Sequence, residues 1–422
     1  MRFFLCNILV LFTLSSCVSI KKKISKEIAD TLNSKFYTNQ FTGFLAVDAK
    51  TKDTLFDYNS DRYFTPASNT KIFTLYTALQ LLPEKMPSLK YVNKNDTLYV
   101  EGTGDPTLLH SYFKDSTAIH FLNQHPNIAI NLTNSQEKKF GPGWSWGDYE
   151  WYYSAERSAL PLYGNVLTLF NQENLVAQPE YLKSHVTPIH YSANREQSEN
   201  RFYFAASRKD TLEVPFIVDT SLTLSLLQKV VKNNLSLAKK LPDGERKVLY
   251  SVPSDSVYKR MMQESDNFLA EQLLLVASAS LSDTLNSQKS RDYILKNHLY
   301  DLQQPPRWVD GSGLSRYNLF SPSSLVHVLT KIYDEVSRER LFALFPAGGV
   351  SGTLKNWYPG NPDPYVYAKT GSLGNNHCVS GYLLTKSGKT LIFSFMNNHF
   401  LHPSSEEKRR MQAIFEEIRD NY

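Results

Sequence analysis

The sequence predicts an α/β (α+β) fold in which helices flank an antiparallel sheet. Three observations lead to this prediction: strand-like alternation over residues 43–58, helical spacing of apolar residues over 72–82, and strand-like runs with a closing amphipathic helix over 364–422. Packing the helix on the strands would bury the apolar face of each. The chain of 422 residues is long enough for two or three domains.

The N-terminal elements lie close together in the sequence. Residues 44–48 and 54–58 alternate around the polar Lys50–Asp53 segment, as in a β-hairpin. Apolar residues then recur at near-helical spacing until Pro83 stops the helix. We therefore expect the hairpin and this helix to pack together in one domain. Residues 166–217 are polar without clear periodicity.

The C-terminal part completes the predicted domain. Residues 254–282 read as a helix, a break and a second helix, and 322–336 as a further helix that begins with Pro322. The strand-like runs are residues 364–372, 379–384 and 389–396, and residues 404–422 form the closing helix.

Composition bounds the functional class. The hydrophobic fraction of 41% and charged fraction of 21% are typical of a soluble globular protein. The net charge of +5 is modest, and the only tight basic cluster is Lys21–Lys23, so nucleic acid is not indicated as a partner. The ten histidines are scattered without ligand spacing, so we expect no metal and no cofactor.

Residues 1–17 resemble a bacterial lipoprotein signal peptide. Arg2 precedes an apolar run over residues 3–14 that is too short to span a bilayer comfortably, and Ser15, Ser16 and Cys17 follow. The resemblance implies an exported protein on the periplasmic face, lipid-anchored to a membrane through Cys17, with residues 18–38 as a polar tether. In the alternative, an ordinary signal peptide, Cys17 is accidental. Cys378 is then most simply a small buried apolar residue.

Ser68 and Lys71 form a candidate nucleophile pair where a loop passes into a helix. Side chains three residues apart on a helix are neighbours, so the Lys71 ammonium can reach the Ser68 hydroxyl. In the alternative reading Ser68 is only a helix N-cap, since serine is favoured at that position.

Two more short motifs follow in a fixed order. Ser265, Asp266 and Asn267 occupy the turn between two predicted helices, and Lys369-Thr370-Gly371 lies on a predicted strand near the C-terminus. Ser265 could also simply cap the second helix. A Ser-x-x-Lys, a Ser-Asp-Asn and a Lys-Thr-Gly in this order are the motif set of penicillin-binding proteins and β-lactamases.

The chain resembles the D-alanyl-D-alanine carboxypeptidase/endopeptidase family of penicillin-binding proteins, which insert domains between the first two motifs. The long interval from Lys71 to Ser265 corresponds to that insertion. The resemblance implies a transpeptidase-like domain over residues 39–85 and 250–422 and an inserted mixed α/β domain over 86–249. The insertion looks shorter than in larger members of the family, chiefly over residues 166–217, so the resemblance implies a reduced third subdomain there. It also implies an enzyme that hydrolyses peptidoglycan stem peptides through a Ser68 acyl-enzyme and binds β-lactam antibiotics. Further local matches are residues 102–108, Gly143-Trp144 with the aromatic residues after it, residues 310–316 and residues 368–373.

Acyl transfer needs a nucleophile, a proton acceptor and a route for the proton to the leaving group. Ser68 would attack the D-Ala-D-Ala carbonyl. Lys71 would accept its proton, if burial and the nearby Lys369 cation lower the pKa of Lys71. Ser265 would pass the proton to the leaving nitrogen.

The remaining motif residues would bind the substrate. Asn267 would hold the substrate amide, and the backbone N–H groups of Ser68 and Ser372 would form the oxyanion hole. Lys369, Thr370 and Ser372 would bind the terminal carboxylate.

Three looser matches concern the stem-peptide side chain. By the family pattern, Asp148, Tyr153 and Arg316 would bind the zwitterionic end of diaminopimelate, with Asp148 on the ammonium and Arg316 on the carboxylate. In the alternative reading Asp148 is a solvated loop acid and Arg316 a surface residue.

Two other functions use the same sequence features. A β-lactamase shares the motifs, but the inserted domain and residues 102–108 match the carboxypeptidases better. A non-enzymatic lipoprotein could bind cell-wall glycan with the aromatic residues between 144 and 153. Carboxypeptidase against endopeptidase preference stays open at this point.

Overall fold

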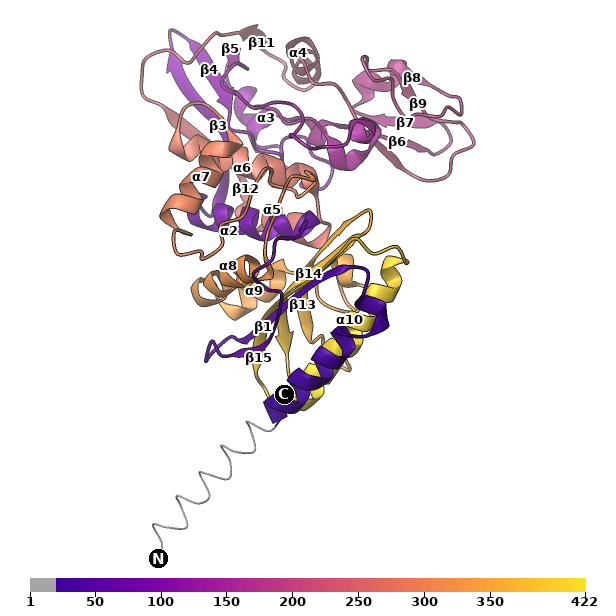
Figure 1. Ribbon diagram of the computed structural model, residues 1–422. Coiled ribbons are helices and arrows are strands. Elements are labelled where there is room, and N and C mark those ends of the chain that lie inside the picture. Colours follow the sequence, from indigo (N-terminus) through magenta and orange to yellow (C-terminus); the bar gives the residue numbers. More distant parts are fainter. Residues whose placement is uncertain (1–19) are drawn as a thin grey trace, which may run out of the picture.

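The computed structural model describes residues 20–422, and its lower half in Figure 1 is built on a five-stranded antiparallel sheet. The strand order is β13-β14-β15-β1-β2, so the N-terminal hairpin pairs with the C-terminal strands. The predicted helix-flanked antiparallel fold is confirmed. The strands are β1 (Phe41–Asp48), β2 (Thr54–Tyr58), β13 (Val366–Leu373), β14 (Asn376–Leu384) and β15 (Thr390–Asn398).

One face of this sheet is covered by two helices that come from opposite ends of the chain. α10 (Ser404–Asn421) lies beside the helical residues 20–32 (Figure 1). Ile24, Ile28 and Leu32 are buried in the same cluster as Met411 and other α10 residues. The prediction of a polar tether over 18–38 was therefore wrong for residues 20–32, because apolar side chains four residues apart line one helix face.

The other sheet face packs on a helical layer. Apolar strand residues alternate between the two clusters: Phe44 and Ala46 face α10, whereas Leu45 faces the helices. The helix α6 is buried almost all round, as expected of a central helix. The helices are α2 (Lys71–Leu81), α5 (Ser254–Gln263), α6 (Asn267–Leu281), α7 (Ser287–Asn297), α8 (Pro322–Glu335) and α9 (Arg338–Leu344).

The inserted segment forms the upper part of the molecule in Figure 1 around a second five-stranded sheet. Its order is β11-β5-β4-β3-β12, with parallel pairs at β4-β5 and β5-β11 and antiparallel pairs elsewhere. The elements are β3 (Lys85–Lys94), β4 (Thr97–Gly102), α3 (Thr117–Leu122), β5 (Asn127–Asn131), α4 (Thr220–Gln228), β11 (Asn234–Leu237) and β12 (Lys247–Pro253).

Residues 166–217 add two small sheets to the insertion. One has the order β10-β6-β7, and β8 pairs with β9 in the other. Leu167, Leu169 and Val214 of the first sheet are buried in the cluster that also contains the second five-stranded sheet. The strands are β6 (Val166–Asn171), β7 (Leu175–Gln178), β8 (Val186–Thr187), β9 (Phe202–Tyr203) and β10 (Leu212–Pro215).

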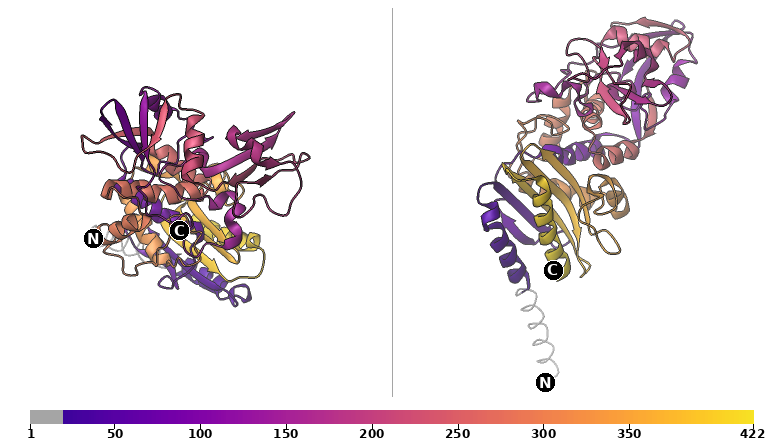
Figure 2. Two further views of the ribbon diagram at one scale, coloured as in Figure 1. Left: turned by 90° about the horizontal axis from the view of Figure 1, so that it is seen from above. Right: turned by 90° about the vertical axis from the view of Figure 1, so that its right-hand side faces the viewer.

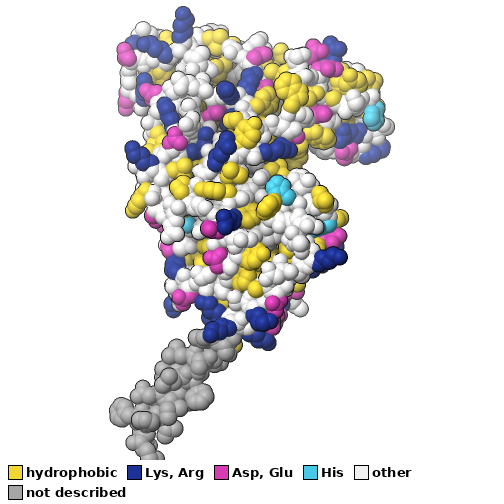
Figure 3. Space-filling model, in the orientation of Figure 1, with side chains coloured by type: hydrophobic (Ala, Val, Ile, Leu, Met, Phe, Trp, Pro, Cys, Tyr) yellow, Lys and Arg dark blue, Asp and Glu magenta, His cyan; other side chains and the backbone are white. Residues whose placement is uncertain are grey.

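The two parts are stacked into an elongated molecule (Figure 2), with α2, α5 and α6 between the two large sheets. On the face drawn in Figure 3, acidic and basic side chains are interspersed. Over residues 20–422 no helix combines the length and the apolar character needed to cross a membrane.

Candidate active site

Ser68 lies in a short 3-10 helix, η2 (Ala67–Thr70), directly before α2. The preceding Ala67 has a left-handed backbone with φ of 47°, which is uncommon for a residue with a Cβ and occurs at functional turns. The N-cap positions belong to Pro66 and Thr70, and the Ser68 hydroxyl instead accepts a hydrogen bond from Lys71 Nζ at 2.9 Å. The alternative reading of Ser68 as an N-cap is therefore wrong.

Lys71 is fully buried, and its ammonium group has three acceptors. Besides Ser68 Oγ, Nζ donates to Asn267 Oδ1 and to the Ser312 carbonyl, both at 2.7 Å. Burial lowers the pKa of Lys71 to about 8, while the carboxylates of Asp310, Asp266 and Glu271 oppose this shift. A lysine of this kind is held in place on the Ser68 hydroxyl and can lose its proton near pH 8.

Ser265 lies between α5 and α6 with a left-handed backbone, φ 59°. Its hydroxyl accepts from Lys369 Nζ at 2.8 Å. Asp266 is the residue that caps α6, since its Oδ1 accepts from Leu269 N at 3.0 Å. The alternative reading of Ser265 as a helix cap is wrong, and its hydroxyl belongs to the polar cluster around the two lysines.

Asn267, the first residue of α6, bridges two parts of the site. Its Oδ1 accepts from Lys71, and its Nδ2 donates to the Tyr153 carbonyl at 3.0 Å. A side-chain amide has two N–H donors, so one remains for a substrate carbonyl.

The third motif lies on β13, the edge strand of its sheet. A Cβ at Gly371 would stand 2.4 Å from the Pro66 carbonyl oxygen, so only glycine lets β13 approach the Ser68 turn this closely. Thr370 Oγ1 donates to Thr353 Oγ1 at 2.8 Å, and Ser372 Oγ lies 2.9 Å from His377 Nδ1.

Lys369 is also fully buried, and its Nζ donates to Ser265 Oγ and to the Thr370 carbonyl. Burial, and secondly repulsion from Lys71, hold the pKa of Lys369 well below its usual range. We predict from the sequence that burial and the Lys369 cation lower the pKa of Lys71. Burial is the largest cause of that shift, and nearby carboxylates oppose it. Repulsion between the two ammonium groups acts on the pair and is expressed mainly in the lowered pKa of Lys369.

The turn over residues 310–316 is held in shape by Asp310, which sequence reasoning did not single out. Asp310 is fully buried, and its carboxylate accepts from the backbone N–H groups of Gly313 and Ser315 at 2.9 and 2.6 Å. Trp144 Nε1 donates to the same carboxylate at 2.9 Å. Gly313 has φ of 83°, and a Cβ there would stand 1.8 Å from the Ala67 carbonyl oxygen, so the turn requires glycine.

Asp148, Tyr153 and Arg316 lie near one another at the side of this site. Tyr153 Oη donates to Asp148 Oδ1 at 3.3 Å. Burial and then Asp148 raise the pKa of Tyr153 to about 12, and Arg316 opposes this shift. Asp148 and Tyr153 are half-buried, in η3 (Trp146–Glu150) and η4 (Tyr152–Ser154), and Arg316 is exposed.

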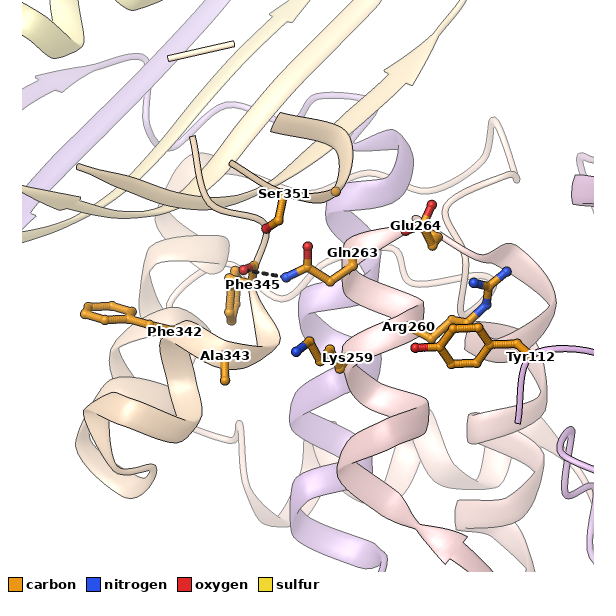
Figure 4. A pocket seen from close by; sticks show the side chains of 10 residues that line it. Tyr112, Lys259, Arg260, Gln263, Glu264, Phe342, Ala343, Phe345 and Ser351 are labelled. Carbon is orange, nitrogen blue, oxygen red and sulfur yellow. Dashed lines mark hydrogen bonds between the residues drawn. The ribbon is translucent and has the colours of Figure 1, made fainter. Parts of the chain in front are cut away.

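A pocket of about 380 Å³ opens beside the second motif (Figure 4). Its lining includes Glu264, directly before Ser265, and Gly352, directly before Thr353. Gln263 Nε2 donates to the Phe345 carbonyl at 2.8 Å and closes one wall. The pocket therefore adjoins the side of the site where Lys369 and Thr370 lie.

Two further predictions from the sequence concern the cysteine residues and metal binding. Cys378 is fully buried, as expected of a small apolar residue, and burial raises the pKa of its thiol to about 12. Within residues 20–422, no group of three or more His, Cys, Asp or Glu side chains could hold a metal ion. Cys17 lies outside the described residues.

The chain is similar to known carboxypeptidases over most of its length. The D-alanyl-D-alanine carboxypeptidase DacB of Haemophilus influenzae is 22% identical to this chain, over 97% of this chain and 96% of the relative. The D-alanyl-D-alanine carboxypeptidase of an Actinomadura strain is also 22% identical, over 90% and 82%.

Solved structures share the fold. Penicillin binding protein 4 of H. influenzae superposes with a TM-score of 0.72 at 20% identity, over 92% of this chain and 97% of that chain. A predatory peptidoglycan endopeptidase of Bdellovibrio bacteriovorus superposes with a TM-score of 0.51 at 17% identity, over 89% of this chain and 92% of that chain.

The family model of the D-Ala-D-Ala carboxypeptidase 3 (S13) family matches residues 24–221 and 217–420. Together these two matches cover nearly all the described residues. The chain belongs to the D-Ala-D-Ala carboxypeptidase 3 (S13) family.

Proposed function

We propose that this protein is a serine-type D-alanyl-D-alanine carboxypeptidase of the bacterial cell wall that also cleaves peptide cross-links. The observation that carries the proposal is the hydrogen bond from a buried lysine of lowered pKa, Lys71, to Ser68. The relatives named above include D-alanyl-D-alanine carboxypeptidases and a peptidoglycan endopeptidase.

In the acylation step, Ser68 Oγ attacks the carbonyl carbon of the penultimate D-alanine and Lys71 Nζ takes the hydroxyl proton. The oxyanion lies between the backbone N–H groups of Ser68 and Ser372, the latter on the edge strand β13. The C–N bond breaks, and the leaving D-alanine nitrogen receives the proton through Ser265, which contacts Lys369. Water then hydrolyses the Ser68 ester and releases the shortened peptide.

The same residues bind the substrate. The free amide N–H of Asn267 holds a substrate carbonyl, and Lys369, Thr370 and Ser372 hold the terminal carboxylate. Because an attack by Ser68 opens a β-lactam ring in the same way, we expect β-lactam antibiotics to acylate Ser68.

The pocket in Figure 4 supports the endopeptidase half of the proposal. It adjoins Ser265 and Thr353, where the leaving group must depart, and its volume of about 380 Å³ exceeds the need of a single alanine. A second stem peptide, the leaving group of a cross-link, could lie there.

The diaminopimelate end of the stem peptide is proposed to bind between Asp148 and Arg316, with Tyr153 beside them. The Tyr153–Asp148 hydrogen bond supports this assignment, since the Tyr153 carbonyl also accepts from Asn267 of the second motif and so links Asp148 to the site.

Residues 1–17 are proposed to be a lipoprotein signal that leaves Cys17 as the lipid-bearing residue. The protein would then act at the periplasmic face of a membrane.

We also propose the division of the chain into a peptidase domain and an insertion with a reduced third subdomain. Because β12 joins the sheet of the insertion, we place the second boundary near Pro253 rather than at residue 250.

The experiment is covalent labelling of the purified protein with a fluorescent penicillin, followed by peptide mapping and a D-alanine release assay on a pentapeptide. We expect a slowly released adduct on Ser68. Rapid release would favour a β-lactamase, and absence of both labelling and D-alanine release would favour a glycan-binding lipoprotein.

A further inference from the structure

A buried ion pair joins the inserted segment to the peptidase helix α6. Arg157 Nη1 lies 3.3 Å from both Glu271 Oε2 and Glu137 Oε1. The side chains of Arg157 and Glu271 are each 1% exposed. Arg157 Nε also donates to the Lys138 carbonyl at 3.0 Å. A charge pair buried this deeply is costly unless it is well hydrogen-bonded, and removing one partner leaves an uncompensated charge.

Glu271 has a second contact that leads to the nucleophile. Its Oε1 accepts from the backbone N–H of Ser312 at 2.8 Å. The carbonyl of the same residue accepts from Lys71 Nζ at 2.7 Å. Glu271 thus touches neither Ser68 nor Lys71 in these hydrogen bonds, yet it holds the residue whose carbonyl orients the ammonium.

A separate contact ties the same insertion to the same turn. Trp144 donates to Asp310, two residues before Ser312. The Arg157 guanidinium lies 5.5 Å from the Trp144 ring centroid, within the range of a cation–π contact. The turn is therefore supported from the insertion at two points.

We infer that Glu271 and Arg157 are positioning residues for Lys71. Arg157 of the insertion holds Glu271, and Glu271 holds the Ser312 peptide at the distance that places Lys71 Nζ on Ser68. The inserted domain therefore contributes to acylation as well as to substrate binding. This inference rests on the proposed function, because it assumes that Lys71 acts on Ser68.

The test separates the acylation rate constant from the noncovalent dissociation constant for a fluorescent penicillin. In Glu271→Ala, Ser312 loses its acceptor, so we expect acylation to slow by about tenfold to a hundredfold, the scale of a misplaced catalytic group. The dissociation constant should stay within about threefold, because the substrate-binding residues are untouched. Glu271→Gln keeps an acceptor oxygen for Ser312 N–H but turns an N–H2 donor toward Arg157, so acylation should fall less than in Glu271→Ala and lie between that variant and the wild type.

Glu407→Ala is the matched control. Glu407 is a fully buried acid on α10, on the other face of the sheet, where it accepts from Asn397 Nδ2 at 2.6 Å and lies 2.7 Å from His402 Nε2. The Glu407→Ala variant should have a lower melting temperature than the wild type but be acylated at the wild-type rate. If Glu271→Ala does not melt cooperatively, Arg157→Met decides, and it should also slow acylation without changing the dissociation constant.

Several outcomes would overturn the inference. The first is a wild-type acylation rate in Glu271→Ala or, where that variant does not fold, in Arg157→Met. The second is an acylation rate in Glu271→Gln as low as that in Glu271→Ala. The third is a fall in the acylation rate of Glu407→Ala equal to that of Glu271→Ala. Failure of the proposed function looks different, because the wild-type protein itself would then not be labelled on Ser68.

Discussion

The protonation state of Lys71 should control the rate at which penicillin acylates Ser68. Only a neutral amine can accept the serine proton, and the pKa of Lys71 is lowered to about 8. At that pKa the neutral fraction is about 1% at pH 6 and about 50% at pH 8. We therefore expect the acylation rate constant to rise about fiftyfold between pH 6 and pH 8 and to level off above pH 9.

The assay is stopped-flow acylation by a fluorescent penicillin from pH 5.5 to 9.5, with circular dichroism at each pH to show that the fold persists. Lys71→Arg is the companion variant, because a guanidinium remains protonated throughout this range and should acylate at least about a hundredfold more slowly. A flat profile for the wild-type protein, or an arginine variant with wild-type rates, would refute Lys71 as the proton acceptor.

The burial of Lys71 should also appear in the pH dependence of stability. Its pKa is lowered on folding, so the folded state disfavours the charged form, and this cost grows as pH falls from about 10.5 towards 8. A shift of this size corresponds to about 3 kcal/mol. Urea unfolding at pH 7 and pH 9.5 should capture about 2 kcal/mol of this cost. Lys71→Met should reduce the pH dependence of stability by that amount, and the contribution of Lys369, whose pKa is also lowered, should remain.

Four further predictions test other residues. Ser68→Ala should lose penicillin labelling and D-alanine release but keep its melting temperature, since its hydroxyl caps no helix; retained covalent labelling would contradict the assignment. Asp148→Ala should lose about 2–5 kcal/mol of binding free energy for a stem peptide whose side chain ends in the diaminopimelate zwitterion, so activity on that peptide should fall. Activity on an analogue that carries acetyl-lysine should scarcely change. An equal fall on both peptides would mean that Asp148 supports the fold rather than the substrate. Ala343→Trp places a large ring at the pocket of Figure 4, so cleavage of cross-linked dimers should fall while pentapeptide cleavage stays unchanged, as chromatography of the products would show. Cys17→Ala should move the protein from the membrane fraction to the soluble fraction, and unchanged membrane recovery would argue against the lipid anchor.

Local patterns were enough to predict the elements that carry the motifs. The hairpin, α2, the pair α5 and α6, and the three C-terminal strands lie close to their predicted ranges. Their periodicities arise from the geometry of a single helix or strand, which short stretches of sequence encode directly. The Ser68–Lys71 contact belongs to the same class, because a spacing of three residues brings two side chains together on helical backbone.

The contacts that pair distant motifs were decided by the tertiary structure. The sequence placed Lys369 on a strand and Ser265 in a turn, but their 2.8 Å hydrogen bond depends on how the edge strand β13 meets the break between α5 and α6. The N-terminal helix over residues 20–32 was missed for a similar reason. Its three apolar residues gain stability only by packing on α10, nearly 400 residues later.

The ion pair between Glu271 and Arg157 is a contact that local sequence patterns could not predict. Glu271 follows Asn267 by one helical turn, a signal that the two share a face, but nothing local indicates that Arg157 lies opposite. Whether a buried carboxylate meets a cation depends on chain segments that fold together from far apart. The sequence by itself thus determined the order of the motifs and the candidate nucleophile. The burial that lowers the pKa of Lys71, and the carboxylates that oppose this shift, arise only when distant segments close around the site.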